Sequence, residues 1–253
     1  RDWGLSAKFQ DLNQDGWPDL YVTNDFWTPD RVWINQGGFF QAIDPLAIRN
    51  QSFSSMTVDF SDLNRDGHVD IYVTEMLSPL HEERARHYKP TGPYPNQRFQ
   101  IEGRPSYNRN SLFTNRGDGT YAELAYFGGV EGTGWSWTTR FLDVDLDGFE
   151  DLLVANGFSY DLQDMDAQMS MHREMATGVR ASQGQLTGYP PLQQVNIAFR
   201  NNGDRTFSDR SQAWGFQGED ISQAMVTGDL DHDGDLDLVI NRLNAPPALY
   251  ENL

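Results

Sequence analysis

Four nine-residue segments of the chain carry aspartate or asparagine at matching positions. They are residues 11–19, 62–70, 143–151 and 229–237, and they share the pattern D-x-[DN]-x-D-G-x-x-D. Oxygens at positions 1, 3 and 5 can converge on one point when glycine at position 6 lets the chain turn sharply. Such hard oxygens suit Ca²⁺, which takes about six to eight of them. The spacing therefore predicts a calcium loop in each segment, and we call the segments aspartate loops 1 to 4.

We expect each ion to be held by the side chains at positions 1, 3, 5 and 9 and by the backbone carbonyl at position 7. The predicted ligands are Asp11, Asn13, Asp15, Trp17 and Asp19 in loop 1, Asp62, Asn64, Asp66, His68 and Asp70 in loop 2, Asp143, Asp145, Asp147, Phe149 and Asp151 in loop 3, and Asp229, Asp231, Asp233, Asp235 and Asp237 in loop 4. Position 3 is Asp in loops 3 and 4 but Asn in loops 1 and 2, so we expect the later pair to bind calcium more tightly.

The residue at position 12 of each loop excludes an EF-hand. An EF-hand needs a bidentate glutamate there and a helix on each side of the loop. The four residues are instead Val22, Val73, Val154 and Ile240, within segments rich in β-branched residues. These segments are typical of strands, so each ion is expected between two adjacent strands.

A second motif follows the first three loops. Residues 32–40, 112–121 and 198–207 each read as strand, Asn/Gly turn and strand, and residues 247–252 begin a fourth copy. Such segments are typical of β-hairpins. One repeat is then strand, aspartate loop, strand, connection, strand, turn and strand. Four antiparallel strands repeated in this way predict an all-β fold, a β-propeller.

The loops and hairpins together resemble the FG-GAP/VCBS repeats of integrin α-subunit propellers. Residues 134–137, 153–157 and 237–241 also resemble bacterial relatives of cartilage acidic protein. The resemblance implies calcium-binding blades, with up to four Ca²⁺. The Phe-Gly-Gly-Ala-Pro signature is absent, and only Phe127-Gly-Gly129 and Trp214-Gly-Phe216 come near it.

We expect a single propeller domain over residues 1–253, with blades at about 5–43, 55–126, 135–212 and 222–253. The fourth copy of the repeat has only three strands. The blades are therefore predicted to be consecutive members of a larger ring, for example a seven-bladed one. A closed four-bladed ring is the alternative. Apolar blade faces at the open ends would pack against remaining blades or another chain.

Two long connections interrupt the repeat, at residues 77–108 and 158–194. Strand alternation places both on the rim opposite the aspartate loops, and long loops in compact domains are often functional. The first is expected to contain a short solvated helix near residues 81–88. In the second, Met165, Met169 and His172 share a helical face, which predicts a helix docked on the ring. A copper site on these side chains is the less favoured reading.

The charge of the chain excludes some partners. It has 37 acidic and 19 basic residues and a net charge of -18, so nucleic acid and anionic membrane surfaces are poor partners. Aspartate outnumbers glutamate by 27 to 10, and 14 of the 27 stand at predicted ligand positions. Four Ca²⁺ would change the net charge from -18 to -10.

Cysteine is absent, which excludes disulfides and thiolate sites. No apolar run approaches the ~18 residues of a membrane span.

These features favour an extracytoplasmic binding module with structural calcium and a protein or glycan partner on the insertion rim. Millimolar calcium outside cells saturates weak sites, whereas cytosolic calcium does not.

Exposed Trp17 or Trp27 would be candidates for stacking on a sugar ring. The Arg116-Gly-Asp118 tripeptide lies in a hairpin turn, and turn chemistry explains it. No catalytic motif is evident, so we expect no enzyme. A polysaccharide-active enzyme and a structural subunit of a larger assembly are the alternatives.

Overall fold

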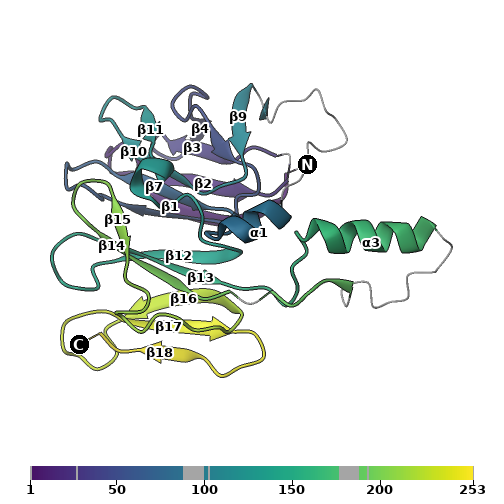
Figure 1. Cartoon of the computed structure of the whole chain (residues 1–253). Coiled ribbons are helices and arrows are strands. Elements are labelled where there is room, and N and C mark those ends of the chain that lie inside the picture. Colours follow the sequence, from purple (N-terminus) through teal and green to yellow (C-terminus); the bar gives the residue numbers. More distant parts are fainter. Residues whose placement is uncertain are drawn as a thin grey trace.

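The computed structural model describes residues 2–26, 28–87, 100–101, 103–176, 188–192 and 194–252. Four antiparallel sheets follow one another along the chain and lie side by side (Figure 1). The fold is all-β, as the repeat predicts, and each sheet is one propeller blade. Trp27 and parts of both insertions lie outside the described residues.

Each of the first three blades has four strands, and the fourth has three. Blade 1 comprises β1 (Gly4–Gln10), β2 (Asp19–Asn24), β3 (Arg31–Asn35) and β4 (Phe40–Ala42). Blade 2 comprises β6 (Thr57–Ser61), β7 (Asp70–Thr74), β10 (Ser111–Asn115) and β11 (Tyr121–Glu123). Blade 3 comprises β12 (Ser136–Leu142), β13 (Asp151–Asn156), β14 (Ile197–Asn201) and β15 (Phe207–Asp209). Blade 4 comprises β16 (Ser222–Gly228), β17 (Asp237–Arg242) and β18 (Ala248–Tyr250).

The aspartate loops join the first and second strands of every blade. In blade 1, β1 pairs with β2 from Gly4↔Asn24 to Gln10↔Asp19, so the loop spans one end of this hairpin. The same register, with the same irregularity two residues into the first strand, recurs in blades 3 and 4. All four loops therefore lie on one rim, and the connections from second to third strands lie on the other. The predicted hairpins are confirmed as β3–β4, β10–β11 and β14–β15.

The blades pack through their innermost strands. Strand β6 lies against β1 and β12, and β12 lies against β16. Three apolar clusters fill the spaces between neighbouring blades, and each contains fully buried side chains such as Tyr21, Leu152 and Ile240. Burying one large apolar side chain stabilises a fold by roughly 1.5–3 kcal/mol, so these clusters hold the order of the blades.

The two outermost blade faces remain exposed and apolar. Phe9 on β1 is 62% exposed, and Val226 on β16 and Leu249 on β18 are 57% and 62% exposed. No strand packing comparable to that between neighbouring blades joins blade 4 to blade 1 within the described part of the chain. Blades 1 and 4 accordingly stand at opposite ends of the molecule (Figure 1).

The insertions add short elements to the rim opposite the aspartate loops. The first contains α1 (His81–Arg86), near the predicted helix, then β8 (Gln100–Ile101) and β9 (Arg104–Tyr107). Strand β9 pairs in parallel with β5 (Gln51–Ser52), which precedes blade 2. A short helix, α2 (Ala125–Gly128), follows blade 2.

The second insertion contains α3 (Met165–Ala176), so the predicted helix is present. Its predicted docking on the ring through Met165, Met169 and His172 is wrong. Met169 is 45% exposed, His172 is also exposed, and the helix projects away from the blades (Figure 1). Met171 instead lies against Gly188, where an added Cβ would be 2.8 Å from its Sδ. The helix therefore packs against the returning segment of its own insertion, at Gly188.

Candidate functional site

The four aspartate loops share one backbone conformation. Glycine at position 6 has φ between 87° and 106° in every loop. Position 4 is also left-handed, with φ of 61° at Gln14, 57° at Arg65, 55° at Leu146 and 68° at His232. Left-handed conformations are uncommon for residues other than glycine. Their recurrence at the same position in all four loops indicates one specific turn and not four irregular ones.

The carboxylate at position 1 holds this turn in loops 1 to 3. Asp11 accepts the backbone N–H of Asp15 at 3.1 Å through one oxygen and that of Gly16 at 2.8 Å through the other. Asp62 and Asp143 make the matching pairs of hydrogen bonds. The carboxylate at position 5 then accepts the N–H of position 7 in all four loops. These bonds turn the acidic side chains toward the inside of the loop.

The aspartates at position 9 have a structural role that the prediction of metal ligands did not include. The four aspartates there are buried, with exposures of 0% for Asp19 and Asp151 and 1% for Asp70 and Asp237. One oxygen accepts the backbone N–H of loop position 2, and the other accepts the N–H of an asparagine at the end of the third strand. In blade 2 these donors are Leu63 at 3.1 Å and Asn115 at 2.8 Å. Each position-9 aspartate thus ties its loop to the third strand.

Burial changes the proton affinity of Asp19, Asp70 and Asp151. It raises the pKa of Asp70 and of Asp151 to about 6, and it raises the pKa of Asp19. The backbone N–H donors oppose the rise because they favour the charged form. A divalent cation beside these carboxylates would likewise favour the charged form.

The asparagine of each hairpin completes the connection. In blades 1 to 3 its side chain donates to the carbonyl of loop position 8, at 3.1 Å for Asn35 to Pro18 and 3.2 Å for Asn115 to Val69. Its side-chain oxygen accepts a glycine N–H of the hairpin turn, as Asn201 does from Gly203 at 2.9 Å. The asparagine that recurs in the hairpin motif is the sequence feature from which this contact could have been predicted.

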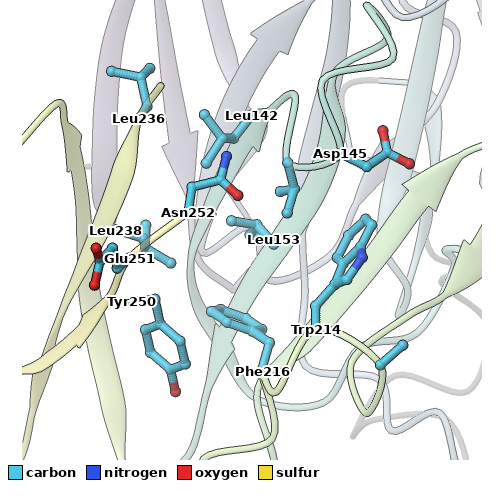
Figure 2. Close-up of a pocket in the computed structure, with 12 residues that line it drawn as sticks. Leu142, Asp145, Leu153, Trp214, Phe216, Leu236, Leu238, Tyr250, Glu251 and Asn252 are labelled. Atoms are coloured by element: carbon cyan, nitrogen blue, oxygen red, sulfur yellow. The ribbon is translucent and has the colours of Figure 1, made fainter. Parts of the chain in front are cut away.

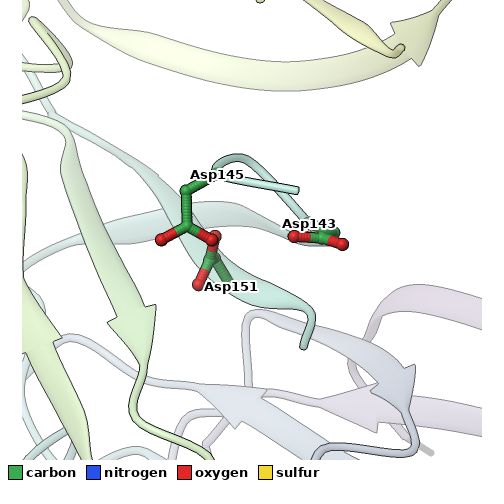
Figure 3. A group of neighbouring side chains, drawn as sticks. All are labelled: Asp143, Asp145 and Asp151. Atoms are coloured by element: carbon green, nitrogen blue, oxygen red, sulfur yellow. The ribbon is translucent and has the colours of Figure 1, made fainter. Parts of the chain in front are cut away.

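Loops 3 and 4 gather carboxylates most closely. Asp143, Asp145 and Asp151 each place one oxygen within 4.8 Å of the others. Figure 3 shows the three side chains on loop 3 and at the start of β13. Asp229, Asp231 and Asp233 form the matching group in loop 4. Asp229 Oδ1 is buried and has no hydrogen-bond partner, which is costly for a carboxylate oxygen. Converging hard oxygens, one of them without a donor, fit a calcium ion.

The position-7 residues, predicted to bind through their carbonyl oxygens, differ in their side chains. Trp17 is 50% exposed on the loop rim. Phe149 lies beside Arg65 of loop 2, whose guanidinium carbon is 5.5 Å from the ring centroid. The side chains of these residues therefore face solvent or the adjacent loop.

Arg200 of β14 reaches into loop 3. Its Nε donates to Asp145 at 2.5 Å, and its Nη2 pairs with Asp147. These are positions 3 and 5 of the loop. Nothing in the spacing of the aspartates indicates this contact, because Arg200 lies in another strand of the blade.

A pocket of about 490 Å³ lies between blades 3 and 4 near the loop rim (Figure 2). Its walls are mainly apolar and include Leu142, Trp214, Phe216, Leu238 and Tyr250. In blades 2 and 3 the fourth strand brings an aromatic side chain to the space beside the preceding blade. Tyr121 packs into the cluster between blades 1 and 2, and Phe207 packs against the cluster between blades 2 and 3. Blade 4 has no fourth strand among the described residues.

A second pocket, of about 480 Å³, opens on the insertion rim between blades 2 and 3. Its lining includes Glu83 and Arg84 of α1, Glu131, Gln194 and Asp209. Arg84 pairs with Glu131 at 3.1 Å, so two of its charges already neutralise each other. The pocket thus combines polar and acidic groups with an apolar floor.

The histidines of the insertions do not form one site. His87 Nε2 lies 2.7 Å from Asp161 Oδ2, and both side chains are buried, which joins the first insertion to the second. His81 and His172 are exposed, and none of the three lines the rim pocket.

Aromatic side chains mark the same rim near the inner strands. Trp135 stacks on Phe158 with centroids 4.6 Å apart, and Trp137 lies beside both. Blade 1 has the pair Trp3 and Phe26 at the equivalent corner, with centroids 5.8 Å apart. Trp3 is 63% exposed, so part of this aromatic surface is open to solvent.

Among the described residues, no helix is both long and apolar enough to cross a membrane.

Comparison with known proteins agrees with the repeat. The FG-GAP-like repeat family matches residues 11–73 and 186–240. Human integrin alpha-7 is 35% identical over 82 residues, which cover 28% of this chain and 7% of the integrin. The mouse protein is 35% identical and the rat protein 34% identical over the same length, again covering 7% of each integrin.

A solved lectin structure from Agrocybe aegerita aligns with 98% of this chain and 66% of the lectin, at 16% identity and a TM-score of 0.36. A likeness at that score carries no information on function. Residues 11–73 and 186–240 thus match FG-GAP-like repeats, and the chain is built as consecutive antiparallel blades of a β-propeller.

Proposed function

We propose that this chain is a binding module whose four aspartate loops hold structural Ca²⁺ and whose insertion rim contacts a protein or a glycan. The main support is the repetition of one loop geometry in four blades. Each loop has left-handed residues at positions 4 and 6 and a buried aspartate at position 9. Surface turns that are acidic by chance have no reason to share these features.

The residues that would hold each ion are the side chains at positions 1, 3, 5 and 9 and the carbonyl at position 7. Calcium would supply a cross-link between the first and second strands of a blade and would offset the repulsion among the carboxylates. Because the ion binds the folded loop and not the unfolded chain, its binding free energy adds to stability, by about 2.7 kcal/mol per site at a concentration of 100 Kd.

The insertion rim is the proposed partner surface. It carries the pocket of about 480 Å³, which is within the ~300–1,000 Å³ range of ligand sites. It also carries the exposed Trp3 and the half-buried Trp135 and Phe158. Aromatic faces with nearby carboxylates suit both sugar rings and protein side chains. We propose binding without catalysis, and a polysaccharide-active enzyme is the alternative.

The exposed apolar faces of blades 1 and 4 are proposed to pack against further blades or another chain. Phe9 corresponds in strand register to Phe60 and Phe141, which are partly buried against the clusters between blades. Leu249 corresponds to Leu112 and Ala198, which are fully buried. Large exposed apolar faces are rare on monomeric proteins and often mark interfaces.

An extracytoplasmic location follows from the calcium requirement and is supported by the integrin-like match. Weak calcium sites are filled at the millimolar concentrations found outside cells.

Chelation tests the calcium part of the proposal. Thermal unfolding is followed in excess CaCl₂ and in EGTA, with MgCl₂ added back to EGTA-treated protein as the ion-specificity control. We expect EGTA to lower the Tm and calcium, not magnesium, to restore it. An unchanged Tm would refute structural calcium.

Capture from native source in calcium buffer tests the partner surface. Wild-type protein is compared with the Trp3→Ala variant on the insertion rim and with Trp17→Ala on the loop rim. Retention that depends on Trp3 and not on Trp17 supports the insertion rim. The reverse result would move the surface to the loop rim. Release of reducing ends from polysaccharides would favour the enzyme alternative.

A further inference from the structure

Arg200 distinguishes aspartate loop 3 from the other three loops. Its Nε donates to Asp145 Oδ2 at 2.5 Å, and its Nη2 pairs with Asp147 Oδ2. The side chain is 31% exposed, and the two carboxylates are each 27% exposed. One guanidinium thus spans the carboxylates at positions 3 and 5, both of them predicted ligands of the ion.

The other blades have no arginine at this position. The residue in question immediately precedes the hairpin asparagine that donates its N–H to the position-9 aspartate, so the four blades can be aligned on that hydrogen bond. The aligned residues are Ile34, Thr114, Arg200 and Glu251. The aligned residue is thus apolar in blade 1, polar and uncharged in blade 2, basic in blade 3 and acidic in blade 4.

The arginine accompanies a different arrangement of the loop. In loops 1, 2 and 4 the side chain at position 3 accepts the N–H of position 5, at 3.1 Å for Asn13, 3.1 Å for Asn64 and 3.2 Å for Asp231. In loop 3 the N–H of Asp147 donates to Asp143 at 3.0 Å, as the position-5 N–H also does in loops 1 and 2, but Asp145 accepts from Arg200 and not from Asp147 N–H. The close group of carboxylates consequently comprises positions 1, 3 and 9 in loop 3, but positions 1, 3 and 5 in loop 4.

A second arginine adds positive charge at the same loop. Arg65 lies over the Phe149 ring, and an added Cβ on Gly148 would be 2.5 Å from its Nη1. Loop 3 therefore carries four aspartates at ligand positions, and two guanidinium groups lie beside it. Loop 4 also has four, and the aligned residue there is Glu251.

We propose that Arg200 is an internal counter-ion that competes with calcium for Asp145 and Asp147 and lowers the affinity of loop 3. This inference rests on the proposed function, because it requires that the loops bind calcium. Calcium binding must displace the guanidinium or weaken its hold on both carboxylates. Loop 3 is consequently weaker than its four aspartates imply, and loop 4 is the tightest site.

The test measures Ca²⁺ binding to the full chain by isothermal titration calorimetry after removal of calcium with EGTA. The variants are Arg200→Gln and Arg205→Gln. Arg205 is exposed in the same hairpin, so its variant removes one positive charge without touching a loop carboxylate. We expect Arg200→Gln to tighten one site by roughly tenfold, which is the Coulomb effect of a unit charge about 5 Å from a divalent ion in water. The Arg205 variant should leave that site unchanged within about twofold.

A double variant assigns the effect to loop 3. Asp143→Ala removes a position-1 ligand of that loop, and Arg200→Gln is then added to it. In this background Arg200→Gln should have no effect on the three remaining sites. In EGTA, Arg200→Gln should also lower the Tm relative to Arg205→Gln, because Asp145 and Asp147 lose their counter-ion.

The outcomes separate the two proposals. Wild-type protein that binds no calcium refutes the proposed function, and this inference with it. Calcium binding that is equal or weaker in Arg200→Gln refutes the inference alone, since Arg200 would then be neutral or would support the bound loop. An effect of Arg200→Gln that persists with Asp143→Ala also refutes it.

Discussion

Asp151 accepts the backbone N–H of Asn201 at 2.8 Å, although the two residues are 50 positions apart in the chain. The other oxygen of the same carboxylate accepts the N–H of Val144 at 3.0 Å. The equivalent aspartate makes the same two bonds in every blade. The last residue of the repeat motif is thus a structural connector as well as a predicted ligand.

Asp70→Asn should destabilise the protein even in EGTA. An amide at this buried position accepts one backbone N–H through its oxygen but presents Nδ2 to the other donor. Leaving a buried donor unpaired costs about 1–3 kcal/mol. Urea unfolding measures the loss. Asp66→Asn, at the exposed position 5 of the same loop, is the matched control and should alter stability only when calcium is present. Equal effects of the two variants in EGTA would contradict the connector role.

Asp30 should make stability depend on pH independently of calcium. It is buried at the start of the third strand and accepts hydrogen bonds from the Tyr21 hydroxyl and the Ser55 hydroxyl, each at 2.9 Å. Burial raises its pKa to about 6, from an ordinary value of 3.8. A raised carboxyl pKa means that the folded state holds the proton more tightly than the unfolded state. The contribution of Asp30 is therefore most favourable below about pH 4 and is lost as pH rises through 6.

The measurement compares wild-type protein with Asp30→Asn by urea unfolding from pH 4 to 7 at saturating calcium. The difference in unfolding free energy should change by up to about 3 kcal/mol across this range, with wild type relatively more stable at the acidic end. Asp44→Asn, at an exposed carboxyl outside the core, is the control for the loss of one negative charge. A pH-independent difference for Asp30→Asn would show that this carboxyl keeps its ordinary pKa.

Charge at position 3 should set the calcium affinity of loops that lack an arginine neighbour. Asp231→Asn removes one negative ligand from loop 4 and should weaken that site by roughly tenfold, whereas Asn13→Asp should tighten loop 1 by a similar factor. Calorimetric titration of the two variants measures both changes. If neither changes by more than about twofold, ligand charge does not decide the ranking of the loops.

The buried pair of His87 and Asp161 should hold the two insertions together. His87→Ala is expected to increase amide hydrogen exchange in α1 and at residues 160–164, because the contact between the insertions is lost. Calcium titration should be unchanged, since the pair is on the opposite rim. His81→Ala, on the exposed side of α1, is the control. Exchange rates that match the control would show that other contacts join the insertions.

The local features of this protein could be predicted from its sequence. Alternation of aspartates, a glycine that takes a left-handed turn and the following β-branched residues are properties of short segments, and Gly16 and its counterparts adopt that turn. The same holds for the hairpins and for the helix at Met165–Ala176. The repetition of these segments predicted antiparallel blades, because one blade must bury its faces against others.

Contacts between distant residues depended on the tertiary structure. Arg200 meets Asp145 only because the register of β13 and β14 brings positions 55 apart in the chain together. His87 meets Asp161, 74 positions away, because two insertions share a rim. The methionine face of α3 was apolar enough to predict docking, yet Met169 is exposed, since the helix packs on its own insertion. Residue type and spacing thus determine turns and strands. Partners across strands are decided by register and packing, which exist only once the chain has folded.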